Sequence, residues 1–190
     1  MQDVLAAVEA AVVEHFGHRP ARASVSFVGV DPIEVLRFEP IPGERAFVTL
    51  GMSRHPMTGA SAEIVNADGP RAELMLHVRD PGDDHADVWR RLAVLAAAPA
   101  VEGVVYVDGM SVELGEPLVA GSAEVGVVIT PSALDDVGTD AGTVTILQAV
   151  PATSNELGWC RVRGSEALRE RWREADADLL DLLRHSVALD

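Results

Sequence analysis

Hydrophobic positions recur at two different spacings along this chain, one typical of helices and one typical of strands. Residues 4–16 place apolar side chains three or four positions apart, with acidic residues between them, and Gly17 ends the pattern. This spacing predicts an amphipathic helix at the start of the chain.

The middle of the chain predicts strands. Alternating or β-branched runs occupy residues 24–30, 33–38, 46–50, 72–78, 104–108, 125–130 and 143–150. Asp31 and Pro32 are expected to separate the first two strands, and Pro151 to close the last, because proline has no N–H for a sheet ladder. Residues 51–69 predict a long loop, and loops of this length often carry function.

Two further stretches have helical spacing. Residues from Val88 onward fit a helix that Pro99 is expected to end. Residues 165–189 contain neither Gly nor Pro and predict one long helix, or two short ones with a bend near Ala175. Helices at both ends and in the middle, without regular strand–helix alternation, predict an α+β fold: a mixed, largely antiparallel sheet covered by helices, with a C-terminal helical segment at 165–190.

Length and charge limit the classes of function. At 190 residues the chain is expected to form a single domain over 1–190. Its net charge of −15 repels nucleic acid and anionic membranes and favours a basic protein partner. All 15 basic residues are arginine, so lysine Schiff-base chemistry and a phosphate-binding P-loop lysine are excluded.

The remaining composition indicates a cytoplasmic protein. The longest nearly unbroken apolar stretch, residues 92–101, is too short to span a bilayer, and the first residues lack the positive start of a secretory signal. Cys160 is the only cysteine, which suits a reducing compartment. The sequence predicts no cofactor, because it contains no dinucleotide-binding or Walker motif.

Two groups of residues offer chemistry, and each has a structural explanation. Gly51 and Ser53 begin a nucleophile-elbow pattern, but His55 stands where its second glycine belongs, which favours a turn over a hydrolase. The acidic stretch 80–87, with His85, has ligands for a divalent metal but no EF-hand spacing. Acidic residues ahead of Val88 more simply cap the helix there, so no metal is predicted.

Four stretches, taken together, resemble one known family. They are Thr49-Leu50-Gly51-Met52-Ser53 with Pro56-Met57, Arg71-Ala72-Glu73-Leu74-Met75-Leu76, Trp89 with the Leu and Ala positions of its helix, and Leu147-Gln148-Ala149-Val150-Pro151 running on to Asn155-Glu156-Leu157. In this order, over residues 45–172, they are similar to the suppressor of fused (SUFU-like) domain family, and the length resembles that of its small, stand-alone bacterial members.

The resemblance implies a binding protein without catalytic residues. Animal members restrain transcription factors of the Hedgehog pathway, and many bacterial members are thought to be immunity proteins that neutralise a toxin. We therefore expect a protein partner, such as a basic toxin. Its contact surface is expected on the long loop and the acidic turn, at Gly51, Met52, Ser53, Pro56, Met57, Asp83, Asp84 and Asp87. The alternatives are a regulatory domain that binds a peptide along a sheet edge and a metal-dependent or serine hydrolase.

Overall fold

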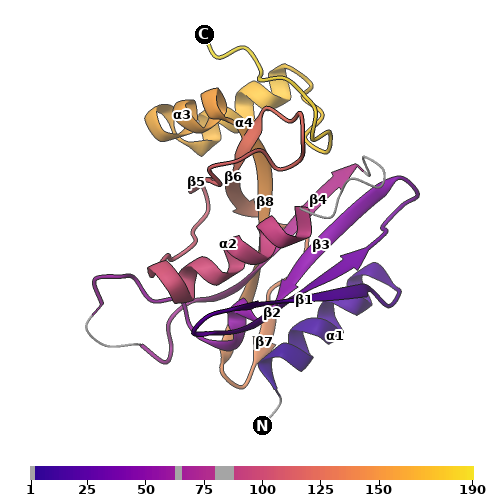
Figure 1. Cartoon of the computed structure of the whole chain (residues 1–190), viewed down its shortest axis with the longest axis vertical. Helices are drawn as coiled ribbons and strands as arrows, with labels where there is room; N and C mark the ends of the chain where they lie inside the picture. The colour runs from indigo at the N-terminus through magenta and orange to yellow at the C-terminus, as the bar shows by residue number, and fades with distance from the viewer. Residues whose placement is uncertain (1–2, 63–65, 80–87) are drawn as a thin grey trace.

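The fold is built on one eight-stranded sheet with helices on both faces and at one end (Figure 1). The structure is a computed structural model that describes residues 3–62, 66–79 and 88–190. The strands are β1 (Ala21–Phe27), β2 (Val30–Phe38), β3 (Glu44–Leu50), β4 (Arg71–Arg79), β5 (Ser111–Glu113), β6 (Glu124–Pro131), β7 (Val137–Thr139) and β8 (Gly142–Thr153). The helices are α1 (Val4–Phe16), the short 3-10 turn η1 (Met52–Arg54), α2 (Val88–Glu102), α3 (Ser154–Arg163) and α4 (Ser165–Glu174).

The strand order confirms the mixed, largely antiparallel sheet. It runs β1-β2-β3-β4-β8-β6-β5, with β7 pairing β8. The parallel pair is β4 with β8, and every other described pair is antiparallel. Antiparallel neighbours therefore form each side of the sheet, and one crossover through α2 joins the two sides.

Strand alternation divides the apolar residues between two helices on opposite faces. On β2, Ile33 and Val35 face the cluster that includes α2, while Leu36 and Phe38 face the cluster that includes α1. Because side chains point alternately to the two faces of a strand, both faces of these central strands are buried. The N-terminal helix follows its prediction, with Asp3 as its N-cap and Gly17 in the left-handed conformation at its end.

The helices α3 and α4 form a third apolar cluster against β6 and β8, at the top of Figure 1. A capping box starts α3: the hydroxyl of Thr153 accepts from the N–H of Glu156, whose carboxylate accepts from the N–H of Thr153. The pattern Thr-x-x-Glu is a sequence signature of a helix start.

The predicted C-terminal helix is shorter than expected. It ends at Glu174, and Asp176 takes a left-handed φ of 48° while the next N–H groups bond back to the last turn. Beyond it the chain forms turns and irregular structure, in which Leu182 and Arg184 are both buried.

Two prolines lie inside the elements that they were expected to end. Pro99 sits in the last turns of α2, where it leaves the carbonyl of Leu95 without its helical N–H donor. The buried hydroxyl of Tyr106 donates to that carbonyl at 2.7 Å. Pro151 lies within β8, and its carbonyl accepts from Arg184 at 3.0 Å on the edge that β6 does not use. Its missing N–H therefore costs no bond to β6.

Two strand predictions also differ from the structure. The first hairpin turns at Val28 and Gly29 rather than at Asp31, so β2 begins earlier than predicted and includes Pro32. Residues 104–108 form no strand, because they pack along α2, and pairing with β6 begins only where Gly109 donates to Ile129. Within the described ranges, no helix has the length and apolar content needed to cross a bilayer.

Candidate functional site

A buried carboxylate, Glu73 on β4, fixes the start of the long loop after β3. It accepts four hydrogen bonds of 2.6–2.9 Å. The donors are the hydroxyl of Thr49, the N–H of Gly51, and both the N–H and the hydroxyl of Ser53. A Cβ on Gly51 would lie 2.9 Å from the carbonyl oxygen of Pro32, and the glycine has a φ of 142°, so no other residue fits there without strain. The protein interior therefore sets the first turn of the loop.

Further bonds hold the rest of the loop. The N–H of Met57 donates to Pro70 at 2.7 Å, and the N–H of Ala60 donates to Gly103, after α2, at 3.1 Å. Gly103 has a φ of 68°, and a Cβ on it would lie 2.5 Å from the nitrogen of Ala60. The guanidinium of Arg71 donates to two carbonyl oxygens of η1, at 2.8 and 3.0 Å. The described part of the loop is thus anchored at several points.

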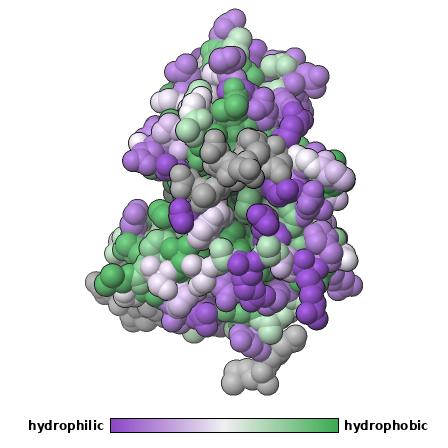
Figure 2. All heavy atoms as spheres, turned by 45° about the vertical axis from the view of Figure 1, so that its right-hand side comes forward, coloured by the Kyte–Doolittle hydropathy of each residue, from purple (hydrophilic) through white to green (hydrophobic). Residues whose placement is uncertain are grey.

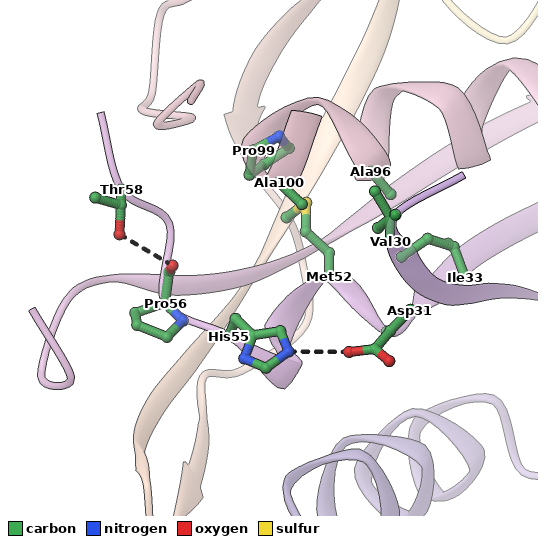
Figure 3. A pocket seen from close by; sticks show the side chains of 12 residues that line it. Val30, Asp31, Ile33, Met52, His55, Pro56, Thr58, Ala96, Pro99 and Ala100 are labelled. Atoms are coloured by element: carbon green, nitrogen blue, oxygen red, sulfur yellow. Dashed lines mark hydrogen bonds and ion pairs between the residues drawn. The ribbon is translucent and has the colours of Figure 1, made fainter. Parts of the chain in front are cut away.

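A cleft of about 360 Å³ lies between this loop, the β1–β2 turn and the C-terminal half of α2 (Figure 3). In Figure 3 the side chain of Met52 extends from η1 toward Ala100 on α2, with Ile33 on the β2 side. The lining is mostly apolar and comprises Gly29, Val30, Asp31, Ile33, Gly51, Met52, His55, Pro56, Thr58, Ala96, Pro99 and Ala100.

Polar groups lie at the rim of the cleft. His55 and Asp31, both exposed, form a hydrogen bond of 3.0 Å, and Arg54 lies 3.7 Å from the same carboxylate. The hydrogen bond from His55, helped by the charge of Arg54, holds the pKa of Asp31 below its ordinary value. An apolar cavity with a few polar groups at its edge is typical of a binding site.

The cleft does not contain the serine–histidine pair of the hydrolase alternative. The hydroxyl of Ser53 is fully buried and donates to Glu73, while His55 is exposed and bonds Asp31. A nucleophile needs its base within hydrogen-bond reach. This geometry explains Ser53 as a structural residue of the turn.

The structure brings together some of the residues predicted to contact a partner. Gly51, Met52 and Pro56 line the cleft, whereas Ser53 lies beneath it. Met57 is buried in the core and, unlike Met52, does not line the cleft, so its side chain offers a partner no contact there. The other predicted contacts, Asp83, Asp84 and Asp87, lie outside the described residues, as does the candidate metal or capping stretch 80–87.

Sequence reasoning missed the walls of the cleft that come from β2 and α2. Asp31, Ile33, Ala96 and Ala100 are far from the loop in sequence and show no motif. Glu73 did have a signal, because it is the one charged residue within the apolar run 72–76, and such a position calls for buried hydrogen-bond donors.

A second buried cluster lies between β6, α3 and the C-terminal segment. Arg184 donates to both carboxylate oxygens of Glu156, at 2.7 and 2.9 Å, and lies 3.1 Å from Glu124. Both carboxylates are fully buried, and the indole N–H of Trp172 also donates to Glu156. One arginine from the end of the chain thus compensates two carboxylates.

The two carboxylates of this cluster differ in their acidity. Burial raises the pKa of Glu124 to about 8, and the nearby Arg184 charge offsets this only in part. Burial also raises the pKa of Glu156, but hydrogen bonds from Arg184 and Thr153 outweigh it and lower that pKa below its ordinary value. Glu124 is therefore the protonated member near neutral pH.

A family model describes most of this fold. The model of the suppressor of fused protein (SUFU) family matches residues 29–185, which include the cleft-forming loop and the buried arginine cluster. No curated protein sequence matches the chain.

Solved structures of similar fold cover nearly the whole chain. A suppressor of fused homologue from Neisseria gonorrhoeae FA 1090 is 18% identical, with a TM-score of 0.74 over 99% of this chain and 98% of that one. A chain from the crystal structure of the Sufu–Fu complex is 14% identical, with a TM-score of 0.71 over 96% and 91%. Drosophila Suppressor of Fused is 14% identical, with a TM-score of 0.73 over 97% of this chain and 51% of its own length.

Proposed function

Because this chain belongs to the suppressor of fused family, we propose that it is a protein-binding domain without catalytic activity. The cleft between η1, β2 and α2 is the centre of its contact surface. The observation that carries this proposal is an apolar cavity whose wall is fixed in advance by the buried Glu73. A site fixed in this way loses little conformational entropy when a partner binds.

The shape of the cleft suits one large apolar side chain of a partner. Binding hot spots are commonly aromatic or aliphatic anchors that fill such a pocket, surrounded by polar groups at the rim. Met52 adds an adaptable, polarisable wall. Figure 2 shows hydrophobic residues gathered between hydrophilic ones on the lower part of the molecule. Binding to a protein also fits the relative from the Sufu–Fu complex, which was solved with a protein partner.

The charge of the chain favours a basic partner, and the distribution of this charge favours a contact on the sheet and its loops over a contact on α3 and α4. Residues 1–153 hold nine arginines and 22 carboxylates, whereas residues 154–190 hold six arginines and eight carboxylates. Most of the net charge of −15 therefore belongs to the part of the chain that contains the cleft. Complementary charge speeds the encounter of two proteins and selects between partners.

We further propose that the partner is a basic toxin, which the domain neutralises by covering its active surface. The acidic charge and the pre-formed cleft support this role, since an inhibitor of this kind needs fast capture and a stable contact. The loop residues Gly51, Met52 and Pro56 would contact the partner directly, with Asp83, Asp84 and Asp87 contributing to its attraction.

Capture of a partner tests the proposal directly. The tagged protein is co-expressed with the products of neighbouring genes and purified, and retained proteins are identified by mass spectrometry. One stoichiometric basic partner, whose toxicity disappears on co-expression, is the expected result. A non-toxic partner retained in the same way would support the binding function and overturn the immunity role.

A substitution in the cleft then locates the contact. Ala100 is exposed and lines the cleft, so Ala100→Trp fills the cavity without disturbing the core. We expect about a tenfold or greater loss of affinity for the captured partner. Val94→Trp is the matched control, because Val94 is exposed on the same helix and does not line the cleft. Equal affinities of the two variants would place the contact elsewhere.

A further inference from the structure

A second, smaller cavity lies at the opposite end of the β1–β2 hairpin from the cleft. Its volume is about 190 Å³, and three arginines from different segments meet in it. Arg19 precedes β1, Arg37 is near the end of β2, and Arg45 is near the start of β3. The other lining residues are His18, Ala21, Phe38 and Glu39.

The strand register explains why these arginines converge. Arg37 pairs with Ala21 on one side and with Phe47 on the other, and Arg45 stands two residues before Phe47. Because cross-strand partners and residues two apart share a face, Arg37 and Arg45 lie on the same face of the sheet. Arg19 stands two residues before Ala21 and so reaches the same end of the hairpin.

The histidine of this cavity fixes the backbone around it. Nδ1 of His18 donates to the carbonyl of Phe16 at 2.9 Å, and Nε2 accepts from the N–H of Glu39 at 3.3 Å. Its ring also meets the ring of Phe38 edge-on, with centroids 5.6 Å apart. These contacts tie the end of α1 to the end of β2, which places Arg19 beside the other two arginines.

Two of the three arginines of this cavity have side chains without an ionic partner among the described residues. Arg45 forms an ion pair of 3.0 Å with Glu39. The side chains of Arg19 and Arg37, in contrast, form no hydrogen bond, ion pair or ring contact with any residue that the structure describes, and no other described arginine shares this property. The chain has 30 carboxylates for its 15 arginines, so a shortage of acidic partners is not the cause.

We propose that this cavity binds a dianionic phosphate group. Three guanidinium groups and the single carboxylate of Glu39 leave a net charge of +2, which a phosphate dianion balances. The planar guanidinium group matches phosphate oxygens in two-pronged hydrogen bonds. The ligand is a small molecule or ion, since the charge of −15 on the whole chain repels a nucleic acid.

Calorimetric titration with inorganic phosphate tests the site, in chloride buffer of constant ionic strength. The double variant Arg19→Gln/Arg37→Gln removes both unpaired cations, and both side chains are exposed, so the fold is retained. We expect its dissociation constant for phosphate to rise about tenfold or more. The control Arg173→Gln removes an exposed arginine that already pairs with Glu166 and Glu170, and should bind phosphate like the unmodified protein.

A parallel titration with O-phosphoserine identifies the source of the phosphate group. Tighter arginine-dependent binding of phosphoserine indicates a phosphate ester, and equal or weaker binding indicates the free ion. Both results support the site. Binding of neither probe to the unmodified protein, or equal binding by the unmodified protein and the double variant, would overturn it. No partner protein takes part, so the result is independent of the proposed function.

Discussion

The two buried carboxylate sites solve the same physical problem in different ways. Glu73 is surrounded by four neutral donors from residues 49–53, all within one stretch of chain. Glu156 and Glu124 instead depend on one cation, Arg184, which arrives from near the end of the chain. Burying a charged group is costly unless hydrogen bonds or an opposite charge compensate it.

This difference separates local from long-range organisation. The Glu73 site shapes the turn beside the cleft and needs only the β3–β4 connection. The Arg184 site joins β6, α3 and the C-terminal segment, and it leaves both carboxyl oxygens of Glu124 without a hydrogen bond within the described residues. The first site therefore fixes the turn beside the cleft that we propose as the binding surface, and the second joins the C-terminal segment to the rest of the fold.

Removing Arg184 should have the largest effect. Arg184→Met leaves the buried carboxylate of Glu156 without its cation, and removing one partner of a buried ion pair typically costs about 3–5 kcal/mol. We expect the urea midpoint of unfolding to fall accordingly. The control Arg173→Met removes only exposed ion pairs and should cost less than about 1 kcal/mol. Similar urea midpoints of the two variants would show that Arg184 does not hold the C-terminal segment against the rest of the fold.

Replacing Glu73 tests the locally organised site. In Glu73→Gln the amide nitrogen cannot accept a hydrogen bond, so donors of the turn lose their partner in the interior. We expect a loss of about 2–3 kcal/mol in the free energy of unfolding. The exposed Glu102→Gln is the control and should leave that free energy nearly unchanged. Chemical shifts around Met52 should change in the first variant only, and unchanged shifts there would contradict a role for Glu73 in shaping the cleft.

The pH dependence of stability distinguishes the two sites further. With a pKa of about 8 in the folded protein and an ordinary pKa of 4.5, Glu124 takes up a proton on folding between these two pH values. The folded state then binds more protons than the unfolded state. The contribution of Glu124 to the free energy of unfolding is therefore fully present below pH 4.5 and is lost as the pH rises through 8. Glu156, whose pKa is lowered, contributes in the opposite sense, and its contribution is lost only in more acidic solution.

Glu124→Gln isolates this effect. An amide stays neutral, so between pH 5 and pH 9 the free energy of unfolding of the variant should rise relative to that of the unmodified protein by about 4 kcal/mol, because each unit of difference in pKa is worth about 1.4 kcal/mol. The measurement is the difference between the two urea-unfolding free energies at each pH, which cancels the titration of all other groups. A difference that does not change with pH would contradict the raised pKa of Glu124.

Much of the fold could be predicted from local patterns, whereas long-range compensation could not. The α+β class, the long loop and most strands follow from alternation in the sequence. Pro99 and Pro151 misled the prediction. Tyr106 donates to the carbonyl that Pro99 leaves without a donor, and the missing N–H of Pro151 costs no bond to β6, because the Pro151 carbonyl faces Arg184 instead. Arg184 lies 33 residues from Pro151 in the sequence, so no local pattern around Pro151 indicates this contact.

The candidate site was predictable only in part for the same reason. Gly51, Met52 and Pro56 could be predicted from the sequence, since a long loop with a glycine turn is a recognisable signal. The opposite wall, from β2 and α2, is created by the packing of separate elements and has no local pattern. The arginine cavity likewise depends on strand register, which brings Arg37 and Arg45 together across β2 and β3.

Amide hydrogen exchange with and without the captured partner tests most directly whether the cleft is the binding site. The account predicts that binding slows exchange in the turn at residues 28–31 and in the loop at 54–58, which border the cleft. Exchange in α3 and α4 should not change. Slowed exchange confined to α3 and α4, with the borders of the cleft unaffected, would contradict the account.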